Sequence, residues 1–215
     1  MDLGRPFDLI AHPAQGAALA VLAGADNGFT PPQVQRIAGR FSVDGIRRAL
    51  ERLSALGVVT SERMGNATCY RLNRDHLAAE AIISLARIRQ RFINLVAAEI
   101  AGWPVGPEYA ALFGSAARDS MRPDSDIDVF IVRPDDVDPD DKGWLVQLDM
   151  FTDAGRRWTG NPVNVLEFSA SEATANARAG DRVLDDISRE GIVLHGPAQY
   201  LSAGKRTVHG QHEMR

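Results

Sequence analysis

The sequence predicts an α+β protein in two parts. A helical N-terminal half ends in a β-hairpin, and a C-terminal half forms a mixed β-sheet flanked by helices. Three observations predict this. Apolar residues recur at helical spacing through much of residues 14–101. Two short strand-like runs lie on either side of Met64-Gly65-Asn66. Beyond residue 107, strand-like runs alternate with helical stretches.

The composition sets the broad class of protein. With 215 residues, 45% of them hydrophobic, the chain can bury a core and is long enough for two small domains. A single cysteine, Cys69, excludes an intrachain disulfide framework and is expected to be a small buried apolar residue. The N-terminal residues do not resemble a signal peptide, and no apolar run is long enough to span a membrane. We therefore expect a cytoplasmic protein with no membrane partner.

The charge is unevenly distributed along the chain. Residues 1–101 hold 12 Lys and Arg against 9 Asp and Glu, while residues 102–215 hold 12 against 19, and the total is −4. This asymmetry suggests different partners for the two halves.

Each element of the N-terminal half has a local signal. Thr30 is a candidate N-cap with Pro31 at the first helical position, Ser42 is the next candidate N-cap, and Gly57 is placed to end the helix that Ser42 begins. The expected elements are helices over residues 14–25, 30–38 and 42–56, then strands over 58–63 and 67–72.

A long helix is expected from residue 74 to residue 101. Its apolar stripe is predicted to consist of Leu77, Ala81, Leu85, Ile88, Phe92 and Leu95. A homodimer is expected through this helix. The Pro- and Gly-rich segment 102–107 is expected to be a linker.

The C-terminal half alternates strands and helices. Residues 133–141 are expected to form an acidic loop that contains two prolines. We expect it to be exposed to solvent, and we expect its negative charge to interact favourably with the positive end of the dipole of the next helix. The expected elements are a strand ending at Phe113, a strand over residues 126–132, a helix over 140–158 with Trp144, Leu145, Leu148 and Phe151 on one side, a strand over 161–169, a further helix, a strand over 191–195, and a poorly ordered tail over 203–215.

Chemistry is concentrated between residues 112 and 132. A Gly-Ser turn after an apolar strand, here Gly114-Ser115, can hold phosphates. Asp126 and Asp128 lie two residues apart at the start of the next strand, so their carboxylates share one face. Mg²⁺ is usually held by one or two carboxylates together with substrate phosphates.

The segment from Phe113 to Val132 resembles the minimal nucleotidyltransferases of the polymerase-beta superfamily. The resemblance rests on the Gly-Ser pair, Arg118, the Ser125-Asp126 pair and the Asp-x-Asp. It implies an enzyme that transfers a nucleoside monophosphate from a nucleoside triphosphate to a hydroxyl group, with ATP as the expected triphosphate and Mg²⁺ or Mn²⁺ as cofactor.

The resemblance also implies residue roles. Asp126 and Asp128 would be the catalytic metal ligands, and the nucleotide would be bound by Gly114, Ser115, Arg118 and Ser125. For Arg118 we also consider a salt bridge to Asp119 or Asp124.

The sequence departs from this family at a third position. Active members usually supply a third carboxylate from the next core strand. If Val163 and Val165 pack inward, Asn164 takes that place, and an amide can bind a metal through oxygen but cannot accept a proton at neutral pH. Glu167 is expected to face the opposite side unless a bulge intervenes. The chain therefore either works with two carboxylates or has lost catalysis.

The order helix, helix, helix, hairpin resembles the winged helix-turn-helix domains of bacterial transcription regulators. This implies a recognition helix over residues 42–56 whose outward arginines, Arg47, Arg48 and Arg52, reach DNA together with Arg63 beside the wing. The same fold also serves in dimerisation or protein docking, and exposed arginines are often only solvated.

The expected domains are a winged helix over residues 1–74, a connecting helix and linker over 75–107, a nucleotidyltransferase domain over 108–200 and a tail over 201–215. Three functions remain open: a nucleotidyltransferase, a DNA-binding regulator whose degenerate transferase domain senses nucleotide, and an antitoxin that adenylylates a partner toxin.

Overall fold

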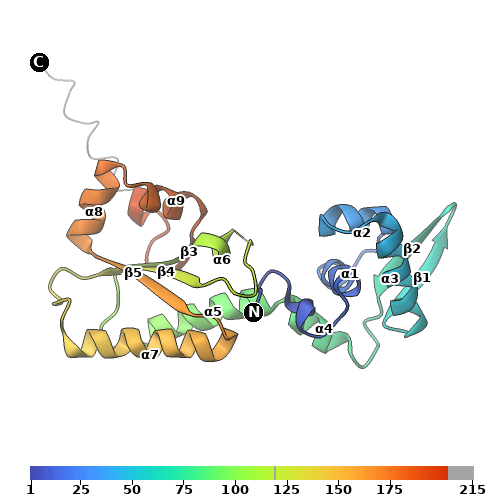
Figure 1. Ribbon diagram of the computed structural model, residues 1–215, viewed down its shortest axis with the longest axis horizontal. Coiled ribbons are helices and arrows are strands. Elements are labelled where there is room, and N and C mark those ends of the chain that lie inside the picture. The colour runs from blue at the N-terminus through green and yellow to red at the C-terminus, as the bar shows by residue number, and fades with distance from the viewer. Residues whose placement is uncertain (119, 203–215) are drawn as a thin grey trace, which may run out of the picture. The chain divides into compact units, whose positions relative to one another are not determined.

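The computed structural model describes residues 1–118 and 120–202 (Figure 1). It contains two compact units, one formed by Arg5–Gln90 and the other by Met1–Gly4 together with the chain from Arg91 onward. Each unit has a hydrophobic core of its own. Within the described residues, no helix combines the length and apolar character needed to cross a bilayer.

The unit Arg5–Gln90 is mostly helical, and its helix starts follow from local sequence. Thr30 and Gln33 form a capping box at the start of α2, and the Ser42 hydroxyl accepts a hydrogen bond from the Gly45 nitrogen at the start of α3. The elements are η1 (Pro6–Leu9), α1 (Pro13–Ala23), α2 (Pro31–Ala38), α3 (Val43–Ala55), β1 (Val59–Met64), β2 (Ala67–Leu72) and α4 (Ala79–Ala86).

The core of this unit lies between the helices and the hairpin. Its fully buried side chains include Leu22, Val34, Ile46 and Leu50. The strands β1 and β2 pair antiparallel around a turn in which Gly65 has a φ of 61°, a conformation that glycine adopts at little cost. Three helices followed by a hairpin thus occur where the sequence predicts them, while the winged-helix resemblance stays a prediction.

The prediction of one long helix over residues 74–101 is wrong. Two helices occupy the segment, α4 and α5 (Ile88–Ala101), and they are separated at Arg87, whose nitrogen is shared between the Ile83 and Ser84 carbonyls at 3.1 and 3.3 Å. No Pro or Gly marks this break, which lies close to the boundary between the units. The predicted stripe is also wrong at Leu77, Ala81 and Leu95, which are exposed. The buried residues of α5 are Phe92, Ile93, Val96 and Ile100.

The second unit contains a four-stranded mixed sheet in the order β5-β4-β3-β6. β3 pairs antiparallel with both β4 and β6, and β4 pairs parallel with β5. The mixed α+β class predicted for the chain is therefore confirmed. Its elements after α5 are β3 (Tyr109–Phe113), α6 (Gly114–Ala117), β4 (Ile127–Arg133), α7 (Lys142–Thr159), β5 (Val163–Ser169), α8 (Ala170–Ala179), α9 (Arg182–Glu190) and β6 (Ile192–His195).

Helices cover both faces of this sheet (Figure 1). Helices α5 and α7 lie on one face, where Trp144 and Phe151 of α7 are buried, and α8 and α9 lie on the other, where Ala173 and Leu184 are buried. Because side chains alternate along a strand, β4 sends Ile127, Val129 and Ile131 to the first face and Phe130 and Val132 to the second.

Two expectations near α7 need correction. The helix begins at Lys142 rather than Asp140, because the Asp141 side chain caps it by accepting from the Trp144 nitrogen at 2.9 Å, and Leu145 is exposed rather than on the buried side. The expected linker 102–107 packs against the core through Trp103, whose ring lies edge-on to Trp144 and Phe151 at centroid distances of 5.8 and 5.7 Å, while Gly102, Pro104 and Gly106 are exposed.

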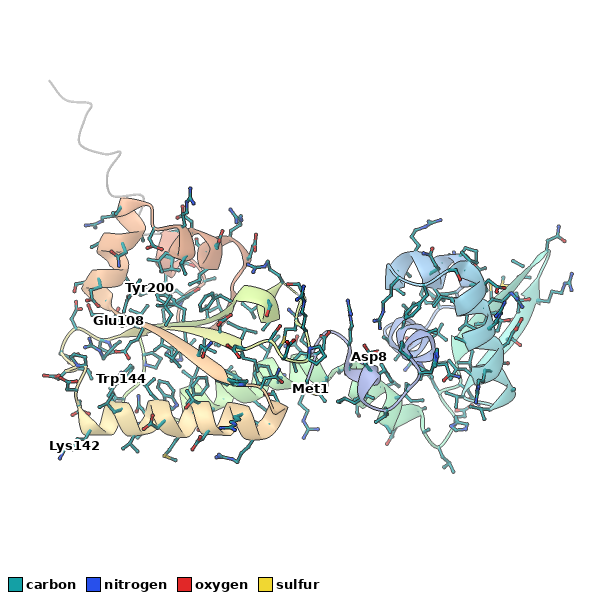
Figure 2. All side chains as sticks on the ribbon, viewed as in Figure 1. Met1, Asp8, Glu108, Lys142, Trp144 and Tyr200 are labelled. Carbon is teal, nitrogen blue, oxygen red and sulfur yellow. The ribbon has the colours of Figure 1, made fainter. Side chains whose placement is uncertain are left out.

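The expected tail begins too early. Leu201 is buried against the second face of the sheet, and the Tyr200 ring stacks on Tyr109 while its hydroxyl donates to Glu108 at 2.7 Å (Figure 2). Residues 201 and 202 therefore belong to the folded unit. The expectation of a poorly ordered segment over 203–215 lies outside the described residues.

Candidate active site

The site begins where β3 ends. Gly114 follows Phe113 with a φ of +67°, which only glycine adopts readily, and it opens the short helix α6. A Cβ atom on Gly114 would collide with the Asp128 carboxylate. The turn and the carboxylate are therefore in direct contact, and the absence of a side chain at residue 114 allows this contact.

The two aspartates lie at the start of β4. Ile127 between them is fully buried on the α5 and α7 face, so Asp126 and Asp128 both project to the opposite face. Parallel pairing places Asn164 of β5 opposite Asp128. Its amide nitrogen donates to the Asp126 carboxylate at 3.1 Å. Asn164 thus lies beside both carboxylates, with Val163 and Val165 packed toward the α7 side.

The Asp128 carboxyl has a raised pKa. Burial is the main cause, and the negative charge of Asp126 raises it further. A hydrogen bond from Asn164 and the positive charge of Arg118 act in the opposite direction without cancelling the effect. Two neighbouring carboxylates, one exposed at Asp126 and one half-buried at Asp128, favour a bound cation, because a cation stabilises their charged forms.

The donor set suits a hard divalent cation. Two carboxylates and one amide oxygen are the ligand types that Mg²⁺ prefers. Over residues 1–118 and 120–202, no group of three or more His, Cys, Asp or Glu side chains could hold a metal ion. A cation at this site would therefore rely on Asp126 and Asp128, with Asn164 as the third group.

The other predicted nucleotide-binding residues lie around this pair in different ways. Ser115 is in α6, one residue after the Gly114 turn. The Ser125 hydroxyl accepts a hydrogen bond from the Arg122 nitrogen at 2.9 Å, so it closes the loop that leads into Asp126.

Arg118 pairs with a residue that the sequence did not suggest as its partner. Its guanidinium lies 3.4 Å from the Glu190 carboxylate at the end of α9. Together with Gly114, the two residues line a pocket of about 180 Å³. Both side chains are partly exposed, and such pairs contribute little to stability, so a phosphate group could compete for the arginine.

Asn161, between α7 and β5, is a second residue near the site that the sequence patterns did not predict. Its side chain is almost fully buried, and its amide nitrogen donates to the Ser125 carbonyl at 2.8 Å and to the Pro123 carbonyl at 3.1 Å. Its amide oxygen accepts from the Met1 nitrogen. The Asn-Pro pair before a strand was the only local signal, and it predicts a turn rather than a contact across 36 residues.

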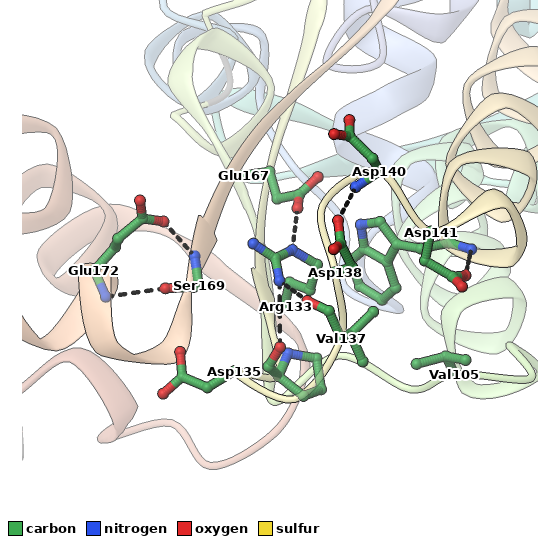
Figure 3. A network of polar contacts seen from close by, with 12 residues as sticks. Val105, Arg133, Asp135, Val137, Asp138, Asp140, Asp141, Glu167, Ser169 and Glu172 are labelled. Atoms are coloured by element: carbon green, nitrogen blue, oxygen red, sulfur yellow. Dashed lines mark hydrogen bonds and ion pairs between the residues drawn. The ribbon is translucent and has the colours of Figure 1, made fainter.

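The acidic loop after β4 is organised by one arginine (Figure 3). Arg133 is buried, binds Glu167 at 2.7 Å and also donates to the Val137 carbonyl. Glu167 is therefore engaged away from Asn164, as period-two alternation predicts. The loop carboxylates bind backbone nitrogens, with Asp135 accepting from Ser171 and Asp141 capping α7.

The four arginines that are expected to contact DNA have different partners within the protein. Arg47 lies 2.5 Å from Asp44 and 2.6 Å from Glu51, so both sides of its guanidinium are neutralised. Arg48 pairs with Asp44 at 2.6 Å, and Arg63 donates to the Gly65 carbonyl within the hairpin turn. Arg52 makes no ion pair with any residue in the described ranges, and it lines a groove of about 520 Å³ together with Arg48, His12 and Phe41.

One family model matches part of the chain. Residues 97–168 match the family model of the nucleotidyltransferase domain. This range includes Gly114, Asp126, Asp128 and Asn164. No curated protein matches the chain.

Two solved structures show a distant similarity. One is the crystal structure of a toxin-antitoxin with AMP-PNP, with 16% identity, a TM-score of 0.38, and coverage of 53% of this chain and 80% of that one. The other is TrmBL2, an archaeal chromatin protein described as having a novel mode of DNA binding, with 14% identity, a TM-score of 0.29, and coverage of 83% and 73%. Neither similarity is close enough to assign a property to this chain.

Proposed function

We propose that the unit containing residues 91–202 is a Mg²⁺-dependent nucleotidyltransferase. It would transfer a nucleoside monophosphate from a nucleoside triphosphate, with ATP as the preferred substrate, to a hydroxyl group. The observation that carries this proposal is the contact between the Gly114 turn and the Asp128 carboxylate, which brings a phosphate-binding turn and a metal-binding pair to one point. The match of residues 97–168 to the nucleotidyltransferase domain supports it.

Each residue of the site has a proposed role. Asp126 and Asp128 would hold Mg²⁺ or Mn²⁺, with the Asn164 oxygen as an additional ligand, and a metal held there would supply positive charge against the phosphates. The Gly114 and Ser115 backbone nitrogens and the Ser115 hydroxyl bind the terminal phosphates. Arg118 would exchange its ion pair with Glu190 for a contact with a phosphate oxygen. Positioning and charge neutralisation are the main contributions in this kind of chemistry.

The acceptor is activated without a third carboxylate. Asn164 occupies the position beside Asp126 and Asp128, and its amide cannot take the proton of the attacking hydroxyl. Glu167 is held by Arg133 and does not replace it. The proton is therefore expected to leave to a group that the acceptor or the triphosphate supplies.

Transfer of label tests the proposal directly. The protein is incubated with Mg²⁺ and each α-labelled nucleoside triphosphate, beside an Asp126→Asn/Asp128→Asn variant, and self-labelling and pyrophosphate release are measured. Transfer that disappears in the variant supports a working enzyme. Nucleotide binding without transfer to any acceptor would favour the alternative, a degenerate domain that senses nucleotide.

A second proposed function is DNA binding by the unit Arg5–Gln90. The specific observation in its favour is Arg52, an uncommitted arginine on the exposed side of α3 beside the groove that also holds Arg48. Phosphate contacts give a linear dependence of log affinity on log salt concentration. A partner toxin remains a proposal from the sequence resemblance, and co-purification with a neighbouring gene product would test it. The homodimer was expected through one long helix, which the structure divides into α4 and α5; it remains a proposal that light scattering would test.

Arg47 provides a matched control for the DNA proposal. Arg52→Ala is expected to weaken binding to mixed-sequence duplex DNA and to reduce the salt slope by about 1. Arg47→Ala should change the slope much less, because Asp44 and Glu51 already neutralise that side chain. Equal effects of the two substitutions, or no binding by the unaltered protein, would contradict the proposal.

A further inference from the structure

The Asn161 side chain binds the loop that leads into the Asp126–Asp128 pair. Residues 122–125 connect the α6 region to β4, and the Asn161 amide nitrogen donates to two carbonyls of this loop, those of Pro123 and Ser125. Ser125 immediately precedes Asp126. The distance of 2.8 Å to the Ser125 carbonyl is that of a well-formed hydrogen bond.

All the hydrogen-bonding groups of the Asn161 side chain are in use. Its two amide hydrogens go to the loop, and its oxygen accepts from the Met1 nitrogen, which itself donates to the Pro123 carbonyl at 3.2 Å. Only 1% of the residue is exposed. A fully satisfied buried amide fixes the groups around it. Removing it would take this donor away from the half-buried Ser125 carbonyl, while the Pro123 carbonyl would keep the Met1 nitrogen.

Asn161 itself is rigidly placed. Gly160 ends α7 in the left-handed conformation, with its nitrogen donating to the Arg156 carbonyl. The Asn161 nitrogen donates to the Thr159 hydroxyl at 3.1 Å. The next residue, Pro162, accepts a hydrogen bond from the Ile127 nitrogen at 2.9 Å, between the two aspartates. The end of α7 therefore reaches the start of β4 at two neighbouring points.

We infer that Asn161 is a positioning residue for the carboxylate pair. Asn161 binds the carbonyl of Ser125, the residue immediately before Asp126, and Asn164, three residues further on, binds the Asp126 carboxylate itself. The inference rests on the proposed function, because it assigns Asn161 to the metal site. Groups that orient metal ligands typically change metal affinity by about 10- to 100-fold when they are removed.

Gln147 offers a matched control. It is also a buried amide of the same unit. It makes two hydrogen bonds to the backbone of one residue, donating to the Val105 carbonyl at 2.9 Å and accepting from the Val105 nitrogen. It lies on α7 beside residues 102–105 and is not part of the site. Asn161→Ala and Gln147→Ala should therefore cost similar stability, while only the first should affect the metal site.

The experiment measures Mn²⁺ binding to the full chain by calorimetry, well below the melting temperature of each variant. We expect Asn161→Ala to raise the Mn²⁺ dissociation constant by about 10- to 100-fold, and Gln147→Ala to leave it within about twofold. Equal Mn²⁺ affinity in Asn161→Ala and the unaltered protein, with both folded by circular dichroism, would overturn the inference.

Two additional samples complete the test. If Asn161→Ala does not fold, Asn161→Ser replaces it. The shorter serine side chain has one donor and cannot serve both carbonyls, so the affinity should fall by at least about threefold, and a smaller loss would overturn the inference. The Asp126→Asn/Asp128→Asn variant reports on the proposed function separately. If the unaltered protein binds Mn²⁺ no better than this variant, the metal site itself is refuted; if it binds Mn²⁺ and Asn161 has no effect, only the positioning role is refuted.

Discussion

At the scale of single residues, Gly114 shows how backbone conformation and site geometry depend on each other. A side chain at this position meets two obstacles, a φ of +67° and the Asp128 carboxylate. Positive φ alone costs a non-glycine residue about 1–2 kcal/mol. The clash adds a displacement of a proposed metal ligand, so the effect on activity should exceed the effect on stability.

Substitution of two glycines separates these contributions. Gly180, at the end of α8, has a φ of +76°, and no atom of the described residues outside its own neighbourhood lies within 4 Å of the place that a Cβ would take, so Gly180→Ala should cost about 1–2 kcal/mol without affecting the site. Gly114→Ala should cost at least as much and should reduce nucleotidyl transfer by about 100-fold or more. Urea unfolding and label transfer measure the two effects. Equal activity in the two variants would show that the contact with Asp128 has no catalytic consequence.

The raised pKa of Asp128 predicts how its removal changes stability with pH. Because the folded state holds the proton more tightly than the unfolded state, stability falls as pH rises from the ordinary value of 3.8 through the raised one. Without divalent cations, Asp128→Asn should therefore be more stable than the unaltered protein at pH 7. The difference should shrink toward pH 3.8, as urea midpoints across this range would show.

Asp135 should behave in the opposite way. The Ser171 backbone nitrogen donates to it and lowers its pKa, so its charged form stabilises the fold above pH 3.8, and that stabilisation is lost as pH falls through the lowered value. Asp135→Asn should therefore destabilise the protein at pH 7. If both substitutions shifted the urea midpoint in the same direction at pH 7, burial of Asp128 would not be the controlling factor.

Asn164 gives the most direct test of the missing third carboxylate. Asn164→Asp places a third negative charge beside Asp126 and Asp128. We expect lower stability without metal, tighter Mn²⁺ binding, and an increase in transfer rate of about 10-fold or more, since a general base contributes about 10²–10⁴-fold where the geometry is right. Asn164→Ala controls for loss of the amide. An unchanged rate in Asn164→Asp would indicate that the position does not serve as a base.

At the scale of elements, the acidic loop depends on a buried charge. Arg133 is 9% exposed at its side chain and Glu167 24%, and the pair holds the loop through the Val137 carbonyl. Glu167→Ala should cost about 3–5 kcal/mol, because it leaves a buried arginine without its partner. Arg189→Ala, which removes exposed pairs with Asp186 and Glu190, should cost at most about 1 kcal/mol. Similar losses in urea unfolding would contradict a special role for the buried pair.

Local patterns explain why some elements and site residues were predictable. The Gly-Ser turn, the Asp-x-Asp and the position of Asn164 follow from neighbouring residues and period-two alternation. Asn161 and Glu190 were not predictable, because they act on residues 36 and 72 positions away. The break at Arg87 carries no Pro or Gly signal, and the apolar side chains of Leu77 and Leu95 do not by themselves report whether they are buried.

At the scale of the whole molecule, the two units have separate cores. Buried residues of one cluster, such as Leu50, belong to Arg5–Gln90, whereas others, such as Phe151, belong to the unit with the candidate site. Proteins built from separate cores commonly depart from two-state unfolding. We therefore expect two transitions in calorimetry, and a ligand should raise only the transition of the unit that binds it.

Two perturbations assign the transitions. Leu50→Ala should lower one of them, corresponding to a loss of about 2–5 kcal/mol for a fully buried leucine. Mg²⁺ with a non-hydrolysable ATP analogue should raise the other, by about 2.7 kcal/mol at a hundredfold excess over the dissociation constant. If both perturbations moved one shared transition, the units would unfold together. In that case nucleotide binding at Asp126 and Asp128 would also stabilise the unit that holds Arg52, which is the thermodynamic coupling that a nucleotide-sensing DNA regulator requires.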